Sequence, residues 1–330
     1  MGLTVEVMGD RDGLGAIEPA WWDLWRRAGA TPFGSPAWLL PWWDAFAPGR
    51  LHVIAVWRDG RLCGLAPFYL DEGRHARPVG VSLSDYHDAL LDAGAPNAVD
   101  ALAAAMASSL RGGVTGFEWP ELHPGAAALA LRPEARIERD RQGPCPVLAA
   151  PEGSSLFDAV PARKRRKLRM AEHRAARASG GVIARCTGAA IAPAFEALVR
   201  LHRRRWADEG GGVLDDERVL RFHRAALPRL DQAGLLDLFR LDVEGETVGV
   251  HYGLRDGTRA HAYIGGYDPA FAALSPGARL MAHAIREADA AGLREFHFLR
   301  GAEPYKYEWG ATDRVNSRLV FTPAPVPADA

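Results

Sequence analysis

Two stretches of the sequence carry the same hairpin pattern 185 residues apart. Residues 49–69 and 234–254 align without a gap, and each contains two apolar runs around an acidic residue followed by glycine. Asp-Gly between alternating apolar runs is the strongest short-range signal of a β-hairpin. The match indicates a duplicated module, with two unrelated hairpins as the alternative. It pairs Gly49, Leu51, Gly60 and Gly64 with Gly234, Leu236, Gly245 and Gly249.

The second half predicts a sheet flanked by helices. Apolar residues recur there at helical spacing in several segments, and short β-rich runs lie between them. Antiparallel strands followed by a strand–loop–helix–strand unit are typical of an α/β fold with a mixed sheet. We expect helices over 20–27, 38–46, 161–179, 192–208, 216–233 and 277–291, and strands over 51–57, 62–69, 235–243, 247–254, 259–265 and 295–299.

The length of 330 residues suggests two domains or one duplicated domain. Gly, Pro and Ser are concentrated over residues 143–155, which is typical of a loop between domains. We therefore expect a first domain over 1–150, a second over 151–322 and a frayed, Pro/Ala-rich tail over 323–330.

Composition excludes several classes of protein. The formal net charge of -1 argues against a dedicated nucleic-acid binder, and no apolar run approaches the ~20 residues of a membrane span. The first residues lack the basic and apolar regions of a signal peptide, so we expect a cytoplasmic protein. The three cysteines and eleven histidines show no metal-ligand spacing, so we expect no metal. Walker, GxGxxG and GxSxG signatures are missing as well.

Three segments carry candidate chemistry. Ser275-Pro276-Gly277 opens a helix after a strand, where free N–H groups and the helix dipole suit a phosphate; an ordinary cap is the alternative. Beyond a later strand end, Lys306 is one of three lysines among forty basic residues. Six of the seven residues in 163–169 are basic, which suits phosphates or an acidic polymer but is also common on a solvated helix face.

The second half resembles the CelD-like acyltransferases, a branch of the GNAT superfamily related to the FemABX peptidyltransferases. The first half is similar more weakly, through FGSPAWL (33–39), the hairpin and residues 84–88. The resemblance implies a tandem GNAT-like fold with two similar lobes. It rests on RKRRKLRMAEHRAARASGG (163–181), LHRRRW (201–206), the hairpin 235–254, YIGGYDPAFAALSPGARL (263–280) and LREFHFLRGAEPYKYEWG (293–310).

The resemblance also implies acyl-CoA as the donor, with its pyrophosphate on the loop that enters the helix. The strand over 262–266 would separate from its neighbour, and its backbone would polarise the thioester carbonyl. A backbone donor aimed at the developing oxyanion is then the expected main source of rate. The implied cofactor-binding residues are Gly265, Gly266, Ser275, Pro276, Gly277, Ala278 and Arg279.

An amine that attacks a thioester needs a base for its proton, and the thiolate needs an acid. The implied catalytic residues are Asp268, Glu303 and His251 as candidate bases, Tyr263, Tyr267 and Tyr305 as candidate acids, and Lys306, which matches the family's Tyr-Lys pair. The implied acceptor-binding residues are Asp85, Tyr86, His202, Trp206, Arg300 and Trp309. His297 stands where many relatives have an acid, so an essential acid there would mean an altered or inactive enzyme.

We therefore expect an N-acyltransferase that moves an acyl group from acyl-CoA to an amine on a small molecule, peptide or sugar. The first alternative is a Fem-like transferase that uses aminoacyl-tRNA, although the balanced charge and the missing coiled-coil insertion count against tRNA. The second is a non-catalytic scaffold in polysaccharide or natural-product biosynthesis. The sequence leaves the acceptor, the acyl chain length and the oligomeric state open.

Overall fold

The computed structural model describes residues 2–178, 181–207 and 210–324, and the chain forms two compact units. The first unit runs to Gly143 and includes the chain from Val315 on, and the second is Pro144–Arg314. These bounds differ from the expected domains because strand β13 (Thr312–Thr322) pairs with β6 (Gly116–Leu122) of the first unit. Residues 325–330 of the expected tail lie outside the described residues.

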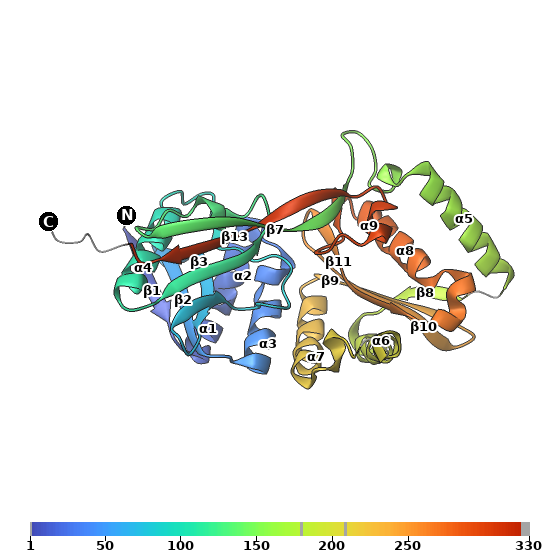
Figure 1. Cartoon of the computed structure of the whole chain (residues 1–330), viewed down its shortest axis with the longest axis horizontal. Coiled ribbons are helices and arrows are strands. Elements are labelled where there is room, and N and C mark those ends of the chain that lie inside the picture. The colour runs from blue at the N-terminus through green and yellow to red at the C-terminus, as the bar shows by residue number, and fades with distance from the viewer. Residues whose placement is uncertain (1, 179–180, 208–209, 325–330) are drawn as a thin grey trace. The chain divides into compact units, whose positions relative to one another are not determined.

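The second unit is a mixed sheet with helices on both faces (Figure 1). Its strands lie in the order β8-β9-β10-β11-β12, and β11 and β12 form a parallel pair. Helices α6 and α8 both contact β9, β10 and β11 from opposite faces, and α5 packs against α8. The elements are α5 (Ala162–Arg177), β8 (Val182–Arg185), α6 (Ile191–Trp206), α7 (Glu217–Gln232), β9 (Leu236–Val243), β10 (Glu246–Arg255), β11 (Arg259–Tyr267), α8 (Pro276–Ala290), β12 (Glu295–His297) and α9 (Pro304–Tyr307).

The first unit repeats this order of elements. Its sheet runs β1-β2-β3-β4-β6, and β4 and β6 are again a parallel pair. In both units a strand is followed by helices, three antiparallel strands, a further helix and a parallel strand. The elements are β1 (Leu3–Met8), α1 (Arg11–Ala16), α2 (Glu18–Ala28), α3 (Pro36–Phe46), β2 (Arg50–Arg58), β3 (Arg61–Leu70), β4 (His75–Pro78), β5 (Leu90–Leu91) and α4 (Ala98–Arg111), with β6 after α4. Strand β7 (Arg136–Ala149) begins in the first unit, and its residues 147–149 pair with β12 in the second.

The two aligned hairpins have the same local geometry. Strand β10 begins and ends 185 residues after β3 begins and ends, which is the offset of the sequence repeat. Each hairpin carries a bulge at the equivalent residue, Cys63 in the first and Val248 in the second. Both turns have positive φ at the acidic residue and at the glycine, as the two-residue turn between twisted strands requires. The shared register, bulge and turn confirm the repeat that the sequence predicts.

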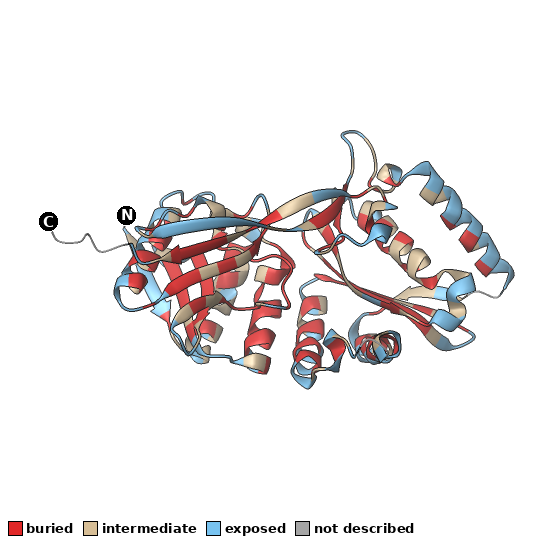
Figure 2. Ribbon diagram, viewed as in Figure 1, coloured by how far each residue is buried: buried red, intermediate tan, exposed pale blue. Residues whose placement is uncertain are grey.

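Each unit has its own hydrophobic core (Figure 2). In the second core, Phe239 of β9 and Phe296 of β12 lie under Leu280 and Ile285 of α8. The stripe predicted for this helix is buried, apart from Met281 at its margin. One prediction needs correction: the strand expected over 295–299 ends at His297, because Leu299 adopts a φ of 60° that a strand does not allow.

The backbone of Gly49, just before β2, lies so close to the backbone of Leu70 that any larger residue at position 49 should destabilise the fold. A Cβ added at Gly49 would lie 2.0 Å from the carbonyl oxygen of Leu70, so the hairpin backbone would have to move. We expect Gly49→Ala to lower the free energy of unfolding by about 1–3 kcal/mol in urea denaturation. Gly257→Ala is the matched control, since a Cβ there meets nothing within 4 Å. Equal stability of the two variants would contradict the prediction.

Candidate active site

The two parallel strands of the second unit separate after three paired residues. Residues 259–261 of β11 pair with 295–297 of β12, and the last pair is His261 with His297. Beyond His261, β11 continues to Tyr267 and pairs with β10 on its other side. We call this divergence of β11 from β12 the fork. Among the described residues, the edge of β11 over 262–266 has no partner strand on its β12 side.

A bulge interrupts β11 just beyond the fork. Tyr252 of β10 pairs with Ile264 and Gly253 pairs with Ala262, so Tyr263 is the extra residue. Bulges of this kind are frequent next to active sites because they turn backbone groups away from the regular ladder. The bulge therefore changes the direction of the backbone amides on the unpaired edge of β11.

The start of α8 lies against the end of β11. Gly277 faces the ring of Tyr267, and a Cβ at this position would lie 3.1 Å from two of the ring carbons. Ser275 precedes the helix in the left-handed region, with a φ of 53°. The N–H groups of the first helical turn have no carbonyl of the same helix in reach, which makes this end suitable for an anion. Residues 275–279 thus adjoin the strand whose edge is unpaired.

The end of β11 contains two glycines, whose missing side chains affect what can lie next to the strand. A Cβ at Gly266 would lie 3.1 Å from Leu198 of α6, so glycine lets that helix approach the strand closely. Gly265 pairs with His251, and a Cβ there would meet only the carbonyl oxygen of Val250 within 4 Å. Gly265 is therefore exposed on the strand, whereas Gly266 is buried against α6, on the face opposite the loop before α8.

Two of the three candidate bases are engaged in structural interactions. Asp268 accepts a hydrogen bond from the N–H of Ala270 and forms an ion pair of 2.6 Å with Arg204. The ring of His251 stacks on Phe239, and burial lowers the pKa of His251 to about 4. Such an imidazole is neutral at pH 7 and weakly basic.

Lys306 and Glu303, the third candidate base, form an internal clasp. The ammonium of Lys306 is 3% exposed and donates to the carbonyl oxygens of Leu299, Arg300 and Gly301 at 2.6–3.2 Å. Its Nζ also lies 2.9 Å from Glu303. The ammonium of lysine directs three N–H groups from a single nitrogen, whereas the five N–H groups of arginine are spread over a larger planar guanidinium. This geometry explains why a lysine is present in an arginine-rich chain.

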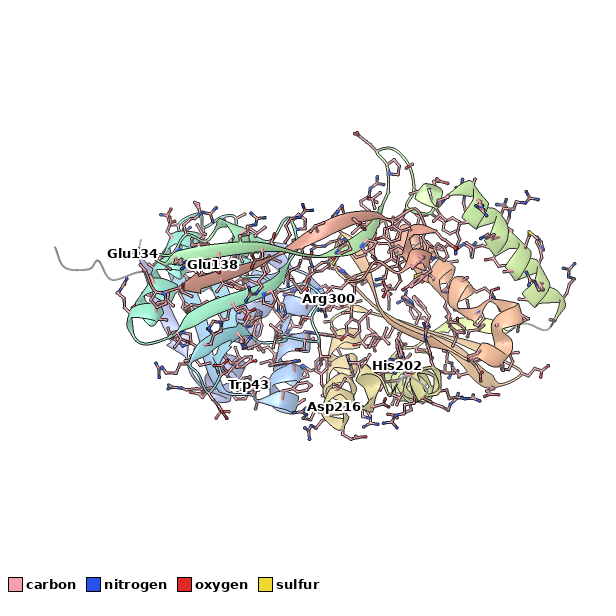
Figure 3. All side chains as sticks on the ribbon, viewed as in Figure 1. Trp43, Glu134, Glu138, His202, Asp216 and Arg300 are labelled. Carbon is pink, nitrogen blue, oxygen red and sulfur yellow. The ribbon has the colours of Figure 1, made fainter. Side chains whose placement is uncertain are left out.

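The predicted tyrosines and acceptor residues lie in several places. Tyr263 contacts Tyr252, Tyr267 covers Gly277, and Tyr305 is 49% exposed. Figure 3 labels His202 on α6 and Arg300 in the loop after β12. The rings of His202 and Trp206 are 6.0 Å apart, and Trp309 is buried under Lys164. Asp85 and Tyr86 are buried in the first unit.

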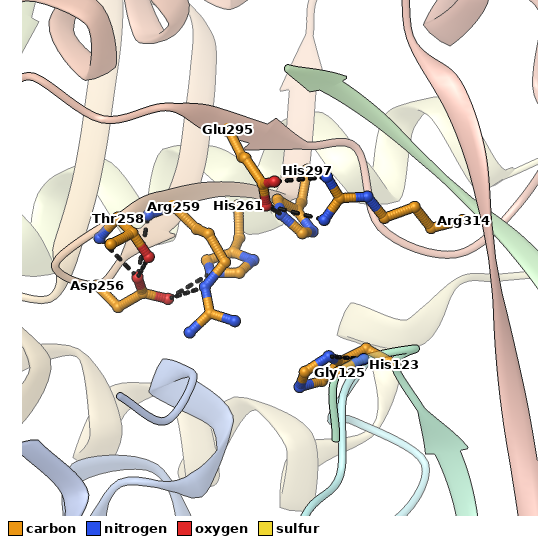
Figure 4. A network of polar contacts seen from close by, with 9 residues as sticks. All are labelled: His123, Gly125, Asp256, Thr258, Arg259, His261, Glu295, His297 and Arg314. Carbon is orange, nitrogen blue, oxygen red and sulfur yellow. Dashed lines mark hydrogen bonds and ion pairs between the residues drawn. The ribbon is translucent and has the colours of Figure 1, made fainter. Parts of the chain in front are cut away.

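The fork also holds a polar network that the sequence did not indicate (Figure 4). His261 bonds to Asp256 at 3.2 Å, and His297 bonds to Glu295 at 2.9 Å. The two imidazole rings have centroids 5.0 Å apart. The one available signal was the spacing of Glu295 and His297, which places both side chains on the same face of a strand.

Two further findings concern metals and membranes. Within residues 2–178, 181–207 and 210–324, no group of three His, Cys, Asp or Glu side chains is arranged to hold a metal ion. In the described part of the chain, no helix has the length and apolar character needed to cross a membrane. The side chains of Cys63, Cys145 and Cys186 are buried thiols.

The fold and a family match define the class of the protein. The chain has a mixed α/β fold whose second unit is GNAT-like, and residues 162–307 match the family model of the acetyltransferase (GNAT) domain. The chain is therefore an acyltransferase by the domain that it carries. No curated protein sequence matches the chain.

Solved structures share the fold over nearly the whole chain. The crystal structure of FemX is 12% identical, with a TM-score of 0.64, over 98% of this chain and 97% of that chain. The C-terminal domain of a putative lysylphosphatidylglycerol synthetase from Agrobacterium fabrum is 11% identical, with a TM-score of 0.61, over 93% and 91%. L-PGS from Bacillus licheniformis is 12% identical, with a TM-score of 0.58, over 88% of each chain. At these identities the likeness shows the fold.

The clasp predicts that Lys306 is required for stability. Lys306→Met would leave three carbonyl groups without their donor, and Lys306→Arg would misplace the charge. We expect both variants to lose about 3 kcal/mol of unfolding free energy in urea. Lys167→Met on the exposed face of α5 is the control and should change little. A Lys306→Arg variant as stable as the unmodified protein would rule out the clasp.

Three buried histidines predict a loss of stability in acid. Burial lowers the pKa of His223 and His297 to about 3 and of His251 to about 4, from about 6.5 in an unfolded chain. The unfolded state therefore binds more protons as the pH falls below about 6.5, and the unfolding free energy should decrease from there toward pH 4. Urea denaturation across this range measures the slope. His223→Gln should reduce it, and His173→Gln, which is exposed, should not.

Proposed function

We propose that the chain is an N-acyltransferase that takes its acyl group from acyl-CoA and transfers it to an amine. The observation that carries this proposal is the fork: two parallel strands that part beside the start of α8. A thioester lying along the unpaired edge of β11 would meet the backbone amides around the bulge, and such fixed donors stabilise a developing oxyanion. The pyrophosphate would bind the first turn of α8, at residues 275–279.

The proposal assigns separate roles to the two ends of the fork. The donor occupies the edge of β11 and the tip of α8, where Gly265 leaves open space and Gly277 packs closely against the ring of Tyr267. The clasp of Lys306 fixes the loop after β12, which borders the acceptor side. We place the enzyme in the CelD-like branch and in the cytoplasm, and we expect a small molecule, peptide or sugar to carry the amine.

Aminoacyl-tRNA is the second candidate donor, and the outer face of α5 favours it. Six cationic side chains are exposed along this helix, whose buried stripe is limited to Leu168, Ala171 and Ala175. A row of exposed cations suits the phosphates of a nucleic acid. The six are Arg163, Arg166, Lys167, Arg169, Arg174 and Arg177.

Thermal unfolding in the presence of acetyl-CoA tests the proposal. A ligand that binds only the folded state adds about 2.7 kcal/mol at a hundred times its dissociation constant, which raises the Tm measurably. Gly277→Val should abolish the shift, because its side chain would collide with Tyr267 and cover the start of α8. Gly257→Val, in an open turn, should keep it.

The same assay separates the alternatives. A shift with total tRNA that is lost when the six exposed cations of α5 are replaced by glutamine would favour the tRNA donor. A cooperative melt that neither ligand changes would favour the non-catalytic scaffold. An acetyl-CoA shift that survives in Gly277→Val would contradict the proposed donor site.

A further inference from the structure

Helix α5 concentrates positive charge on the outside of the second unit. It holds eight of the forty basic residues and one of the forty-one acidic residues, so its formal charge is +7. Because the whole chain has a charge of -1, the residues outside α5 sum to -8. The helix packs on α8 and on residues 269–274 before it, and it is the outermost layer on that side (Figure 1). Figure 2 shows most of its outer face as exposed.

The half-buried cations of α5 are paired with acids, and the exposed ones are not. Lys164 lies 2.9 Å from the carboxylate of Glu308, and Arg165 lies 3.2 Å from that of Asp158. Among the described residues, none of the six exposed cations forms an ion pair with a carboxylate. Their charges are therefore neutralised by small ions from solution, which are released when a polyanion binds in their place.

Most of the exposed cations form a single stripe along the helix. At 3.6 residues per turn, five of the six lie within an arc of about 100° and extend over about 21 Å. Met170, which is 57% exposed, lies at the centre of this arc. We call Met170 and the five cations the basic stripe. The five are Arg163, Arg166, Lys167, Arg174 and Arg177.

We propose that the basic stripe binds the protein to an anionic lipid bilayer. The cations contact the phosphates of the headgroups, and Met170 enters the boundary between the headgroups and the acyl chains. A helix with about four to eight basic residues suits acidic lipids, and each basic side chain near such a surface tightens binding about fivefold. The proposal goes beyond the acyl transfer proposed above and holds for either donor.

Two features of the helix favour a bilayer over the tRNA that is the second candidate donor. Met170 lies among cations, where the headgroup boundary offers it an apolar contact and a row of phosphates does not. The helix contains no Phe, Tyr or Trp on which a base could stack. A flat surface also meets the stripe along its whole length, whereas a polyanion that extends past α5 meets residues of net negative charge.

Co-sedimentation of the full chain with lipid vesicles tests the inference. We expect binding at about 0.1 M salt to vesicles of one part phosphatidylglycerol and two parts phosphatidylcholine, and none to pure phosphatidylcholine. Binding should be lost at about 1 M salt, where charges are screened within about 3 Å. The triple variant Arg163→Gln, Arg166→Gln and Lys167→Gln should bind the anionic vesicles about 100-fold more weakly, and its cooperative melt should be kept.

The matched control removes three exposed arginines from α6 and α7. Arg203→Gln, Arg218→Gln and Arg224→Gln change the net charge by the same amount, but each of these guanidinium groups is paired with a carboxylate. This variant should bind the anionic vesicles within about threefold of the unmodified protein. Equal losses in the two triple variants would overturn the inference, and so would an unmodified protein that does not bind anionic vesicles.

Met170→Gln distinguishes a bilayer from a nucleic acid. It removes the apolar contact at nearly constant side-chain length, so we expect about fivefold weaker binding to vesicles and unchanged binding to total tRNA. Unchanged vesicle binding would contradict the entry of Met170 into the bilayer. Binding of tRNA by the stripe without binding of vesicles would assign the surface to nucleic acid.

The acetyl-CoA shift in Tm separates this inference from the proposed function. An unmodified protein that keeps the shift but ignores anionic vesicles would disprove the docking surface alone. One that binds the vesicles through α5 but shows no shift would leave the docking surface established and count against the acyl-CoA donor.

Discussion

The candidate site of the second unit depends on how short the parallel pairing between β11 and β12 is. It ends at His261 and His297 because the chain after β12 turns away at Leu299, whose φ is positive. On either side of the turn, the N–H groups of Phe298 and Gly301 donate to the carbonyl oxygens of Pro146 and Pro144. The three carbonyl bonds of Lys306 hold the turn in this direction. One buried ammonium thus keeps β12 short and leaves an edge of β11 unpaired.

The first unit has the same strand order, but the position equivalent to the end of β11 is occupied there by the short strand β5. Gly64 and Leu65 of β3 pair with β5, whereas Gly249 and Val250 of β10 pair with β11. His87 then bridges to Leu122, the last residue of β6. The segment that contains Asp85 and Tyr86 therefore lies where the second unit has its fork. The repeat supplied two similar sets of strands, and in the second set β11 continues past its parallel partner with one edge unpaired among the described residues.

The sequence predicts the parts of the fold that depend on local patterns. The hairpins, their common offset and the helix that opens at Pro276 follow from turn residues and apolar spacing. The separation of β11 from its neighbour was expected only through the family resemblance. The pairing of His261 with His297 was not expected, because these residues meet only through a parallel register across an intervening helix. The rarity of lysine marked Lys306 correctly as unusual. Its structural role depends on three backbone carbonyls, which no side-chain pattern reveals.

The charged side chains of the fork balance one another. The side chains of Asp256 and Glu295 carry two negative charges, Arg259 and Arg314 carry two positive ones, and burial keeps the imidazole of His297 neutral. Removal of one partner from such a network leaves the opposite charge without compensation, which costs more free energy than the intact pair contributes. The ion pairs therefore fix the residues at which β11 and β12 part, and these four charged side chains add no net charge beside the unpaired edge of β11.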